Sequence, residues 1–102
     1  MTTTVRDNPE SHRFEVHVDD RLAGFADYRL REDRITFTHT EIDDAYDGQG
    51  LGSQLAEAVL DGARDAGLWV LPACDFVAGY IGRHADRYLA LVPEEARNRY
   101  DL

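Results

Sequence analysis

The hydrophobic pattern of the chain changes its period at a glycine-rich segment, residues 47–53. From Phe14 onward, apolar residues alternate with polar ones, and a period of two indicates strands with one buried face. After the segment, apolar residues recur every four positions, at Leu51, Leu55, Val59 and Ala63. This pattern predicts an amphipathic helix of about fifteen residues that ends at Gly67. The chain should therefore build its strands first and turn into a helix at the glycines.

Three strands are predicted before the helix, over residues 14–18, 22–30 and 34–42. Asp19-Asp20 and Arg31-Glu32-Asp33 are short turn sequences between them, which favours an antiparallel meander. Gly24 marks a weak point or a bulge in the second of these strands.

The remaining segments complete an α+β domain. Residues 68–71 form a short apolar run typical of a strand in the centre of a sheet, and Asp75 is a good N-cap for a second helix to about His84. Residues 1–12 lack periodicity and are expected to be a flexible leader. Residues 13–102 should form a single domain in the order β-β-β-α-β-α, with two main helices packed on a mixed, mostly antiparallel sheet.

The charge of the chain excludes several classes of function. Eleven arginines and no lysines stand against twenty acidic residues, which gives a net charge of −9. This field opposes binding to nucleic acids and to anionic membranes. No apolar run approaches the roughly 18 residues of a membrane span. The acidity fits a cytoplasmic protein, a cationic substrate, or a high-salt cytoplasm, and a monomer is the default expectation for a chain of 102 residues.

The residues from Gly48 to Ser53 form the first candidate site: Gly48, Gln49, Gly50, Leu51, Gly52 and Ser53. A glycine-rich turn that leads into a helix exposes unpaired backbone N–H groups, and the helix dipole favours an anion there. The segment could bind a phosphate or pyrophosphate, although a simple tight turn explains it as well. It has neither the Gly-Lys-Ser/Thr ending of a P-loop nor the spacing of a dinucleotide fingerprint.

His39 and Glu41 form the second candidate site. Regular alternation would place them on one face with Ile35 and Phe37, at the strand end beside the glycines. They could then act as a general base or acid. A solvated polar pair is the alternative.

Cys74 and the second helix supply the other candidates. A cysteine at a helix N-terminus can be held as a thiolate and act as a nucleophile, but most free cysteines are small buried residues. Tyr80 and His84 share a helix face, and Tyr80 could donate a proton or simply pack in the core. Arg83 with His84 belongs to the basic cluster at the end of this helix. One cysteine and four scattered histidines give no metal-ligand spacing, so no metal is expected.

The order and spacing of these motifs resemble the small YjdJ-type branch of the GNAT superfamily of N-acetyltransferases. The resemblance covers residues 14–92 and rests on the following motifs: His39-Thr40-Glu41-Ile42, Gly48-Gln49-Gly50-Leu51-Gly52-Ser53, Gly67-Leu68, Pro72-x-Cys74, Phe76-Val77, Tyr80-Ile81, His84 and Tyr88.

The resemblance implies a site for acetyl-CoA. The cosubstrate would lie where the sheet opens between the strand that ends near Ile42 and the strand 68–71. Its pyrophosphate would bind the amides of residues 48–53, with Arg83 and His84 as sources of positive charge. The acetyl group would pass to an amine of a small molecule or a protein. The branch lacks the helices that usually follow the first strand, so the acceptor side should be open.

Two mechanisms follow from the resemblance. In direct transfer, Glu41 or His39 deprotonates the amine, the amides of residues 40–42 polarise the thioester, and Tyr80 or Cys74 protonates the departing thiolate. In the second mechanism, Cys74 itself carries the acetyl group. Direct transfer is preferred because the superfamily usually works in this way. A CoA-binding module with little catalysis and a Cys74-dependent thioesterase remain as alternatives.

Asp47 departs from the superfamily pattern, which places Arg or Gln at this position. A carboxylate cannot donate to a phosphate and repels it. We therefore expect CoA binding to tighten when salt is added.

Overall fold

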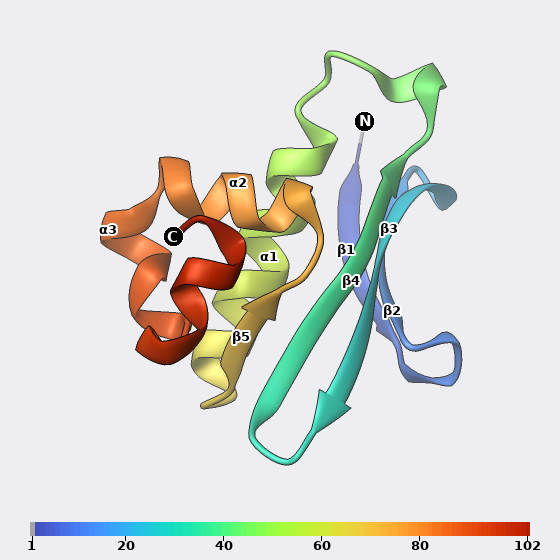
Figure 1. Cartoon of the computed structure of the whole chain (residues 1–102). Helices are drawn as coiled ribbons and strands as arrows, with labels where there is room; N and C mark the ends of the chain where they lie inside the picture. The colour runs from blue at the N-terminus through green and yellow to red at the C-terminus, as the bar shows by residue number, and fades with distance from the viewer. Residues whose placement is uncertain (1) are drawn as a thin grey trace.

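The computed structural model describes residues 2–102 and has a five-stranded sheet with helices along one face (Figure 1). The strands follow one another in space as they do along the chain, and all neighbours are antiparallel except β4 and β5, which are parallel. Their bounds are β1 (Thr3–Asn8), β2 (Arg13–Val18), β3 (Arg21–Arg31), β4 (Arg34–Ile42) and β5 (Trp69–Pro72). This architecture confirms the predicted α+β class with a mixed, mostly antiparallel sheet.

The prediction of a flexible leader over residues 1–12 is wrong for the segment that forms β1. This strand pairs with β2 along its whole length, from Thr3 opposite Val18 to Asn8 opposite Arg13. The hydroxyl of Tyr28 on β3 donates to Asp7 Oδ1 at 2.7 Å, and burial together with this hydrogen bond raises the pKa of Tyr28 to about 12. The observed order of strands and α-helices is thus β-β-β-β-α-β-α-α, and Met1 lies outside the described residues.

Two bulges shift the register of the meander. Val16 faces Gly24 while His17 faces Leu22, so β3 has one extra residue beside the glycine, as predicted. On β4, His39 faces Asp27 and Phe37 faces Tyr28, which leaves Thr38 without a partner. An extra residue moves all following side chains of a strand to the opposite face.

The helices lie against the face of the sheet that carries the core. They are α1 (Leu51–Asp65), α2 (Asp75–Arg83) and the short α3 (Ala85–Tyr88). The amphipathic pattern of α1 is confirmed, because its buried side chains are Leu51, Leu55, Ala56, Val59, Leu60 and Ala63. Within residues 2–102, no helix has the length and apolar composition to cross a membrane.

The end of the chain packs on these helices through 3₁₀ turns. Tyr88 is fully buried and its hydroxyl donates to Asp61 Oδ1 on α1 at 2.8 Å. Arg97 donates to the backbone carbonyls of Leu89 and Val92, each at 3.1 Å. These hydrogen bonds hold a polar, poorly periodic tail in a defined position.

The sheet opens between β4 and β5. The two strands pair only from Arg34 opposite Trp69 to Phe37 opposite Pro72. Pro72 has no N–H group and cannot continue the ladder. Figure 1 shows β4 running on past the end of β5 while the chain after β5 turns away into α2.

We expect Gly62→Ala to stabilise the protein by roughly 0.5–1 kcal/mol, because glycine is a poor residue inside a helix. A β-carbon at this position would meet nothing within 4 Å. Gly62 is exposed and lines a hollow of about 270 Å³, so an added methyl group has room. Urea unfolding measures the change.

Gly24→Ala is the matched opposite case. Its β-carbon would lie 2.5 Å from both the Glu41 carbonyl oxygen and Ile42 Cδ1. We expect this variant to lower the free energy of unfolding by about 1–3 kcal/mol, because the backbone of a paired strand cannot move without breaking its hydrogen bonds. Equal effects of the two substitutions would contradict this account of both sites.

Glu15 on β2 should contribute to the free energy of unfolding by an amount that decreases at low pH. Hydrogen bonds with His17, Asn8 and Arg13, in that order of effect, lower the pKa of Glu15 from 4.5 to about 2. The stabilisation is therefore complete above the unfolded value of 4.5 and is lost as the pH falls toward 2. We expect Glu15→Gln to cost about 1–2 kcal/mol at pH 7 and to flatten the stability curve between these values. Glu10→Gln, in the exposed turn after β1, should leave the curve unchanged.

Candidate functional site

Cys74 and Thr40 face each other across the opening between β4 and β5. Thr40 Oγ1 lies 3.3 Å from Cys74 Sγ, within hydrogen-bond distance for sulfur. Cys74 is only 9% exposed and is itself the N-cap of α2, so the prediction that Asp75 caps this helix is wrong. The position of the thiol at a helix N-terminus is as predicted.

Backbone amides of β4 point into the same opening. The amide of Asp43 donates to the Ala23 carbonyl on β3 at 2.7 Å. Successive N–H groups of a strand point to opposite edges, so those of Ile42 and Thr40 point away from β3. The described pairing of β5 ends at Pro72, opposite Phe37, and does not reach them. The opening thus contains two backbone donors beside a thiol.

His39 and Glu41 lie on the outer face of the sheet. The prediction that they share a face with Ile35 and Phe37 is wrong, because the bulge at Thr38 moves them to the opposite side. Their side chains are 56% and 61% exposed, and His39 Nε2 lies 2.9 Å from Glu41 Oε1. The bulge therefore puts this pair in solvent.

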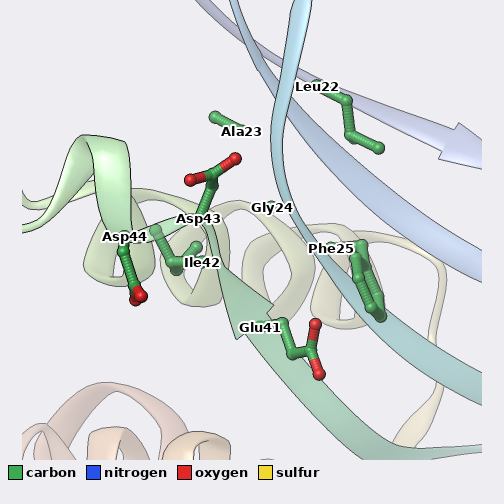
Figure 2. Close-up of a pocket in the computed structure, with 8 residues that line it drawn as sticks. All are labelled: Leu22, Ala23, Gly24, Phe25, Glu41, Ile42, Asp43 and Asp44. Carbon is green, nitrogen blue, oxygen red and sulfur yellow. The ribbon is translucent and has the colours of Figure 1, made fainter.

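A shallow hollow of about 370 Å³ lies at the end of β4, next to Glu41 (Figure 2). Leu22 and Phe25 of β3 form its apolar wall. Asp43 and Asp44 line it with Glu41, and Figure 2 shows the three carboxylates around the end of the strand. This hollow suits a group that combines positive charge with an alkyl chain.

The glycine-rich loop leads directly into α1 and leaves open space around its backbone. Gly48 and Gly50 have φ values of +78° and +75°, a conformation that favours glycine, and a β-carbon on either would meet nothing within 4 Å. The first helical hydrogen bond of α1 runs from the Gln54 amide to the Gly50 carbonyl. The N-cap residue Gly50 has no side chain that could accept from the free amides of the first turn. The amides of residues 51–53 precede this bond and are available to a ligand.

The side chains of this loop contribute less than its backbone. Leu51 is 2% exposed and belongs to the core, whereas Gln49 and Ser53 are exposed. The ring of Phe76 on α2 lies over Gly52. The sequence predicts no role for the side chains of Phe76 and Thr40, because only the fold brings each beside its partner.

Arg83 and His84 are not gathered with the glycine loop. The start of α2 lies at this loop through Phe76, while Arg83 ends the nine-residue helix and His84 follows it. Nine residues of helix span about 13 Å. The Arg83 side chain extends back along α2, since a β-carbon at Gly79 would lie 3.3 Å from its Nη1, whereas the His84 ring lies against that of Tyr80.

Tyr80 is buried among the helices. Its exposed fraction is 4%, and its ring stacks with that of His84 at a centroid distance of 4.4 Å. Burial raises the pKa of Tyr80, and the charge of Glu57 on α1 adds to the effect. This environment is that of a packing residue with a polar tip, and its neighbours lie on the helices.

The loop fits a phosphate ligand by its geometry but not by its charge. Open space and free amides at the start of α1 suit an anion. Asp43, Asp44 and Asp47 bring three carboxylates to the same connection. Among residues 2–102, no three His, Cys, Asp or Glu side chains are placed to hold a metal ion.

One family model matches most of the chain. A family model described as GCN5-related N-acetyl-transferase matches residues 13–91. The solution structure of a GCN5-like protein from Staphylococcus aureus, a candidate N-acetyltransferase, is 24% identical with a TM-score of 0.64, and the match covers 88% of this chain and 87% of that one. A search of curated proteins found no match.

Two larger proteins share part of the fold. The ribosomal-protein-S18-alanine N-acetyltransferase from Escherichia coli is 30% identical over 57% of this chain and 39% of its own, with a TM-score of 0.52. Ard1 from Thermoplasma volcanium is 23% identical over 61% of this chain and 43% of its own, with a TM-score of 0.53. The match spans less than half the length of either protein.

Proposed function

The chain belongs to the GCN5-related N-acetyltransferase family, and we propose that it transfers an acetyl group from acetyl-CoA to a cationic amine. The observation that carries this proposal is the opening between β4 and β5, where the amides of Thr40 and Ile42 lie free beside Cys74. We further propose that the chain belongs to the small YjdJ-type branch, whose motifs it resembles.

The start of α1 is proposed to bind the pyrophosphate of acetyl-CoA. Gly48 and Gly50 leave space around the backbone, and the amides of residues 51–53 donate to the anion. Arg83 and His84 would approach only the nucleotide end. When bound, the cosubstrate supplies an activated acetyl thioester.

The opening is proposed to hold the thioester. One of these two amides, that of Thr40 or that of Ile42, donates to its carbonyl oxygen, where negative charge develops during transfer. Two N–H groups on the same edge of a strand are about 6.6 Å apart, so a single oxygen accepts from only one of them. Cys74, hydrogen-bonded with Thr40, is the group within the opening that can donate a proton to the departing sulfur. Tyr80 then acts mainly by packing.

The outer face of β4 is proposed to receive the amine. Glu41, paired with His39, is exposed where it can accept a proton from an ammonium group. The hollow beside it has an apolar wall and two more carboxylates, Asp43 and Asp44, which favour a cationic amine such as a lysine side chain or a polyamine.

Glu41→Gln should lower kcat on the order of 10²-fold, because it removes the proposed general base. Cys74→Ala should slow transfer without abolishing it, since direct transfer needs no acetylated cysteine. Release of CoA with a panel of amines, including spermidine and a lysine peptide, measures both. Glu32→Gln makes the same charge change at the distant β3–β4 turn and should have no effect.

Other outcomes of this assay support the alternatives. Transfer abolished in Cys74→Ala, with an acetylated wild-type cysteine in mass spectrometry, would establish the covalent mechanism instead. CoA released without any amine, and lost in Cys74→Ala, would indicate a thioesterase. Binding of CoA without turnover on any amine would indicate a binding module.

Asp47→Arg should tighten acetyl-CoA binding about tenfold, because it replaces a repelling carboxylate with a phosphate donor. Wild-type binding should strengthen between low salt and about 0.1 M salt, where screening reaches roughly 10 Å. Calorimetric titration measures both effects. Glu32→Arg has the same change in net charge far from the loop, and an equal gain in that variant would mean that only the overall charge matters.

A further inference from the structure

Phe76 is a large apolar side chain at an exposed position. It lies in the first turn of α2, two residues after Cys74, and is 38% exposed. Burial of an aromatic ring is strongly favourable, so an exposed ring beside a proposed ligand site is a candidate contact for an apolar part of the ligand.

The ring of Phe76 touches α1 at Gly52. A β-carbon at position 52 would lie 2.6 Å from Cζ and 3.1 Å from Cε2 of this ring, and its three nearest atoms would all belong to Phe76. Gly48 and Gly50 differ, because they need glycine for their positive φ and open into free space. The absence of a side chain at Gly52 is therefore explained by Phe76.

This contact places the ring between the two ends of the proposed cosubstrate site. On one side are the amides at the start of α1, which Gly52 shares. On the other is the opening with Cys74, on the same turn of chain as Phe76. A ligand with its phosphates on α1 and its thioester beside Cys74 would have this ring between its two ends.

We propose that Gly52 is a glycine in order to seat Phe76, and that the Phe76 ring is the apolar wall for the pantetheine arm of CoA. The inference rests on the proposed function and adds a binding residue to it. The arm would cover ring surface that is now exposed, which contributes affinity without charge.

Phe76→Ala tests the wall with two ligands. CoA has the arm, whereas ADP has a pyrophosphate without it. We expect Phe76→Ala to weaken CoA binding about tenfold and to leave ADP binding unchanged in calorimetric titrations. Equal CoA affinity in the variant and the wild type would overturn the inference. A wild-type protein that does not bind CoA would instead overturn the proposed function.

Gly52→Ala tests the reason for the glycine. Alone, it should displace the ring and weaken CoA binding about as much as Phe76→Ala does. Added to Phe76→Ala, it should cause no further loss, because its β-carbon then meets no ring. If Gly52→Ala weakens ADP binding in both backgrounds, the glycine serves the phosphates and the inference is wrong.

Leu30→Ala is the matched control for the loss of exposed apolar surface. Leu30 is 58% exposed on β3 near the β3–β4 turn, away from the opening. It should leave CoA binding unchanged. Melting temperatures of all variants separate lost binding from lost folding, and a CoA effect in Leu30→Ala equal to that of Phe76→Ala would also overturn the inference.

Discussion

The parallel pairing of β4 with β5 stops at Phe37 and Pro72, and the whole candidate site depends on this stop. Pro72 cannot donate to the ladder, and the bulge at Thr38 turns β4 at nearly the same level. Beyond this point the inner edge of β4 has free amides, and the chain after β5 brings Cys74 to face Thr40. A local interruption of backbone pairing thus opens the sheet, leaves amides of β4 without a strand partner, and lets the following chain place the Cys74 thiol in the opening.

The elements that were predicted correctly are those whose signals are local. Neighbouring residues determine the four-residue period of α1. They also determine the turn Asp19-Asp20, whose φ values are +49° and +70°. Strand β1 was missed because its residues are mostly polar and half-exposed, with only Val5 as an apolar side chain. It is held by pairing with β2 and by the bond from Tyr28 to Asp7, neither of which its own sequence reveals.

The same distinction holds within the site. The strand-to-helix turn at the glycines and the place of Cys74 follow from local patterns, and both are found in the structure. The face of the sheet on which His39 and Glu41 lie does not follow from a local pattern, because the single extra residue at Thr38 inverts the alternation after it. A role for the Phe76 side chain does not follow from its local pattern, because the glycine that accommodates the ring lies on another helix.

The two sides of β4 present opposite chemistry for the proposed substrates. The outer side offers carboxylates to a cation, and the net charge of −9 strengthens that attraction. The pyrophosphate of CoA is proposed to bind at the start of α1, after the acidic connection with Asp43, Asp44 and Asp47, so its binding has to come from amide dipoles and from apolar contact with the rest of the molecule. Salt weakens the first interaction and relieves the repulsion in the second. The acidic surface attracts a cationic amine but repels acetyl-CoA. Acetyl-CoA therefore has to be held by backbone amides and by the Phe76 ring rather than by ion pairs.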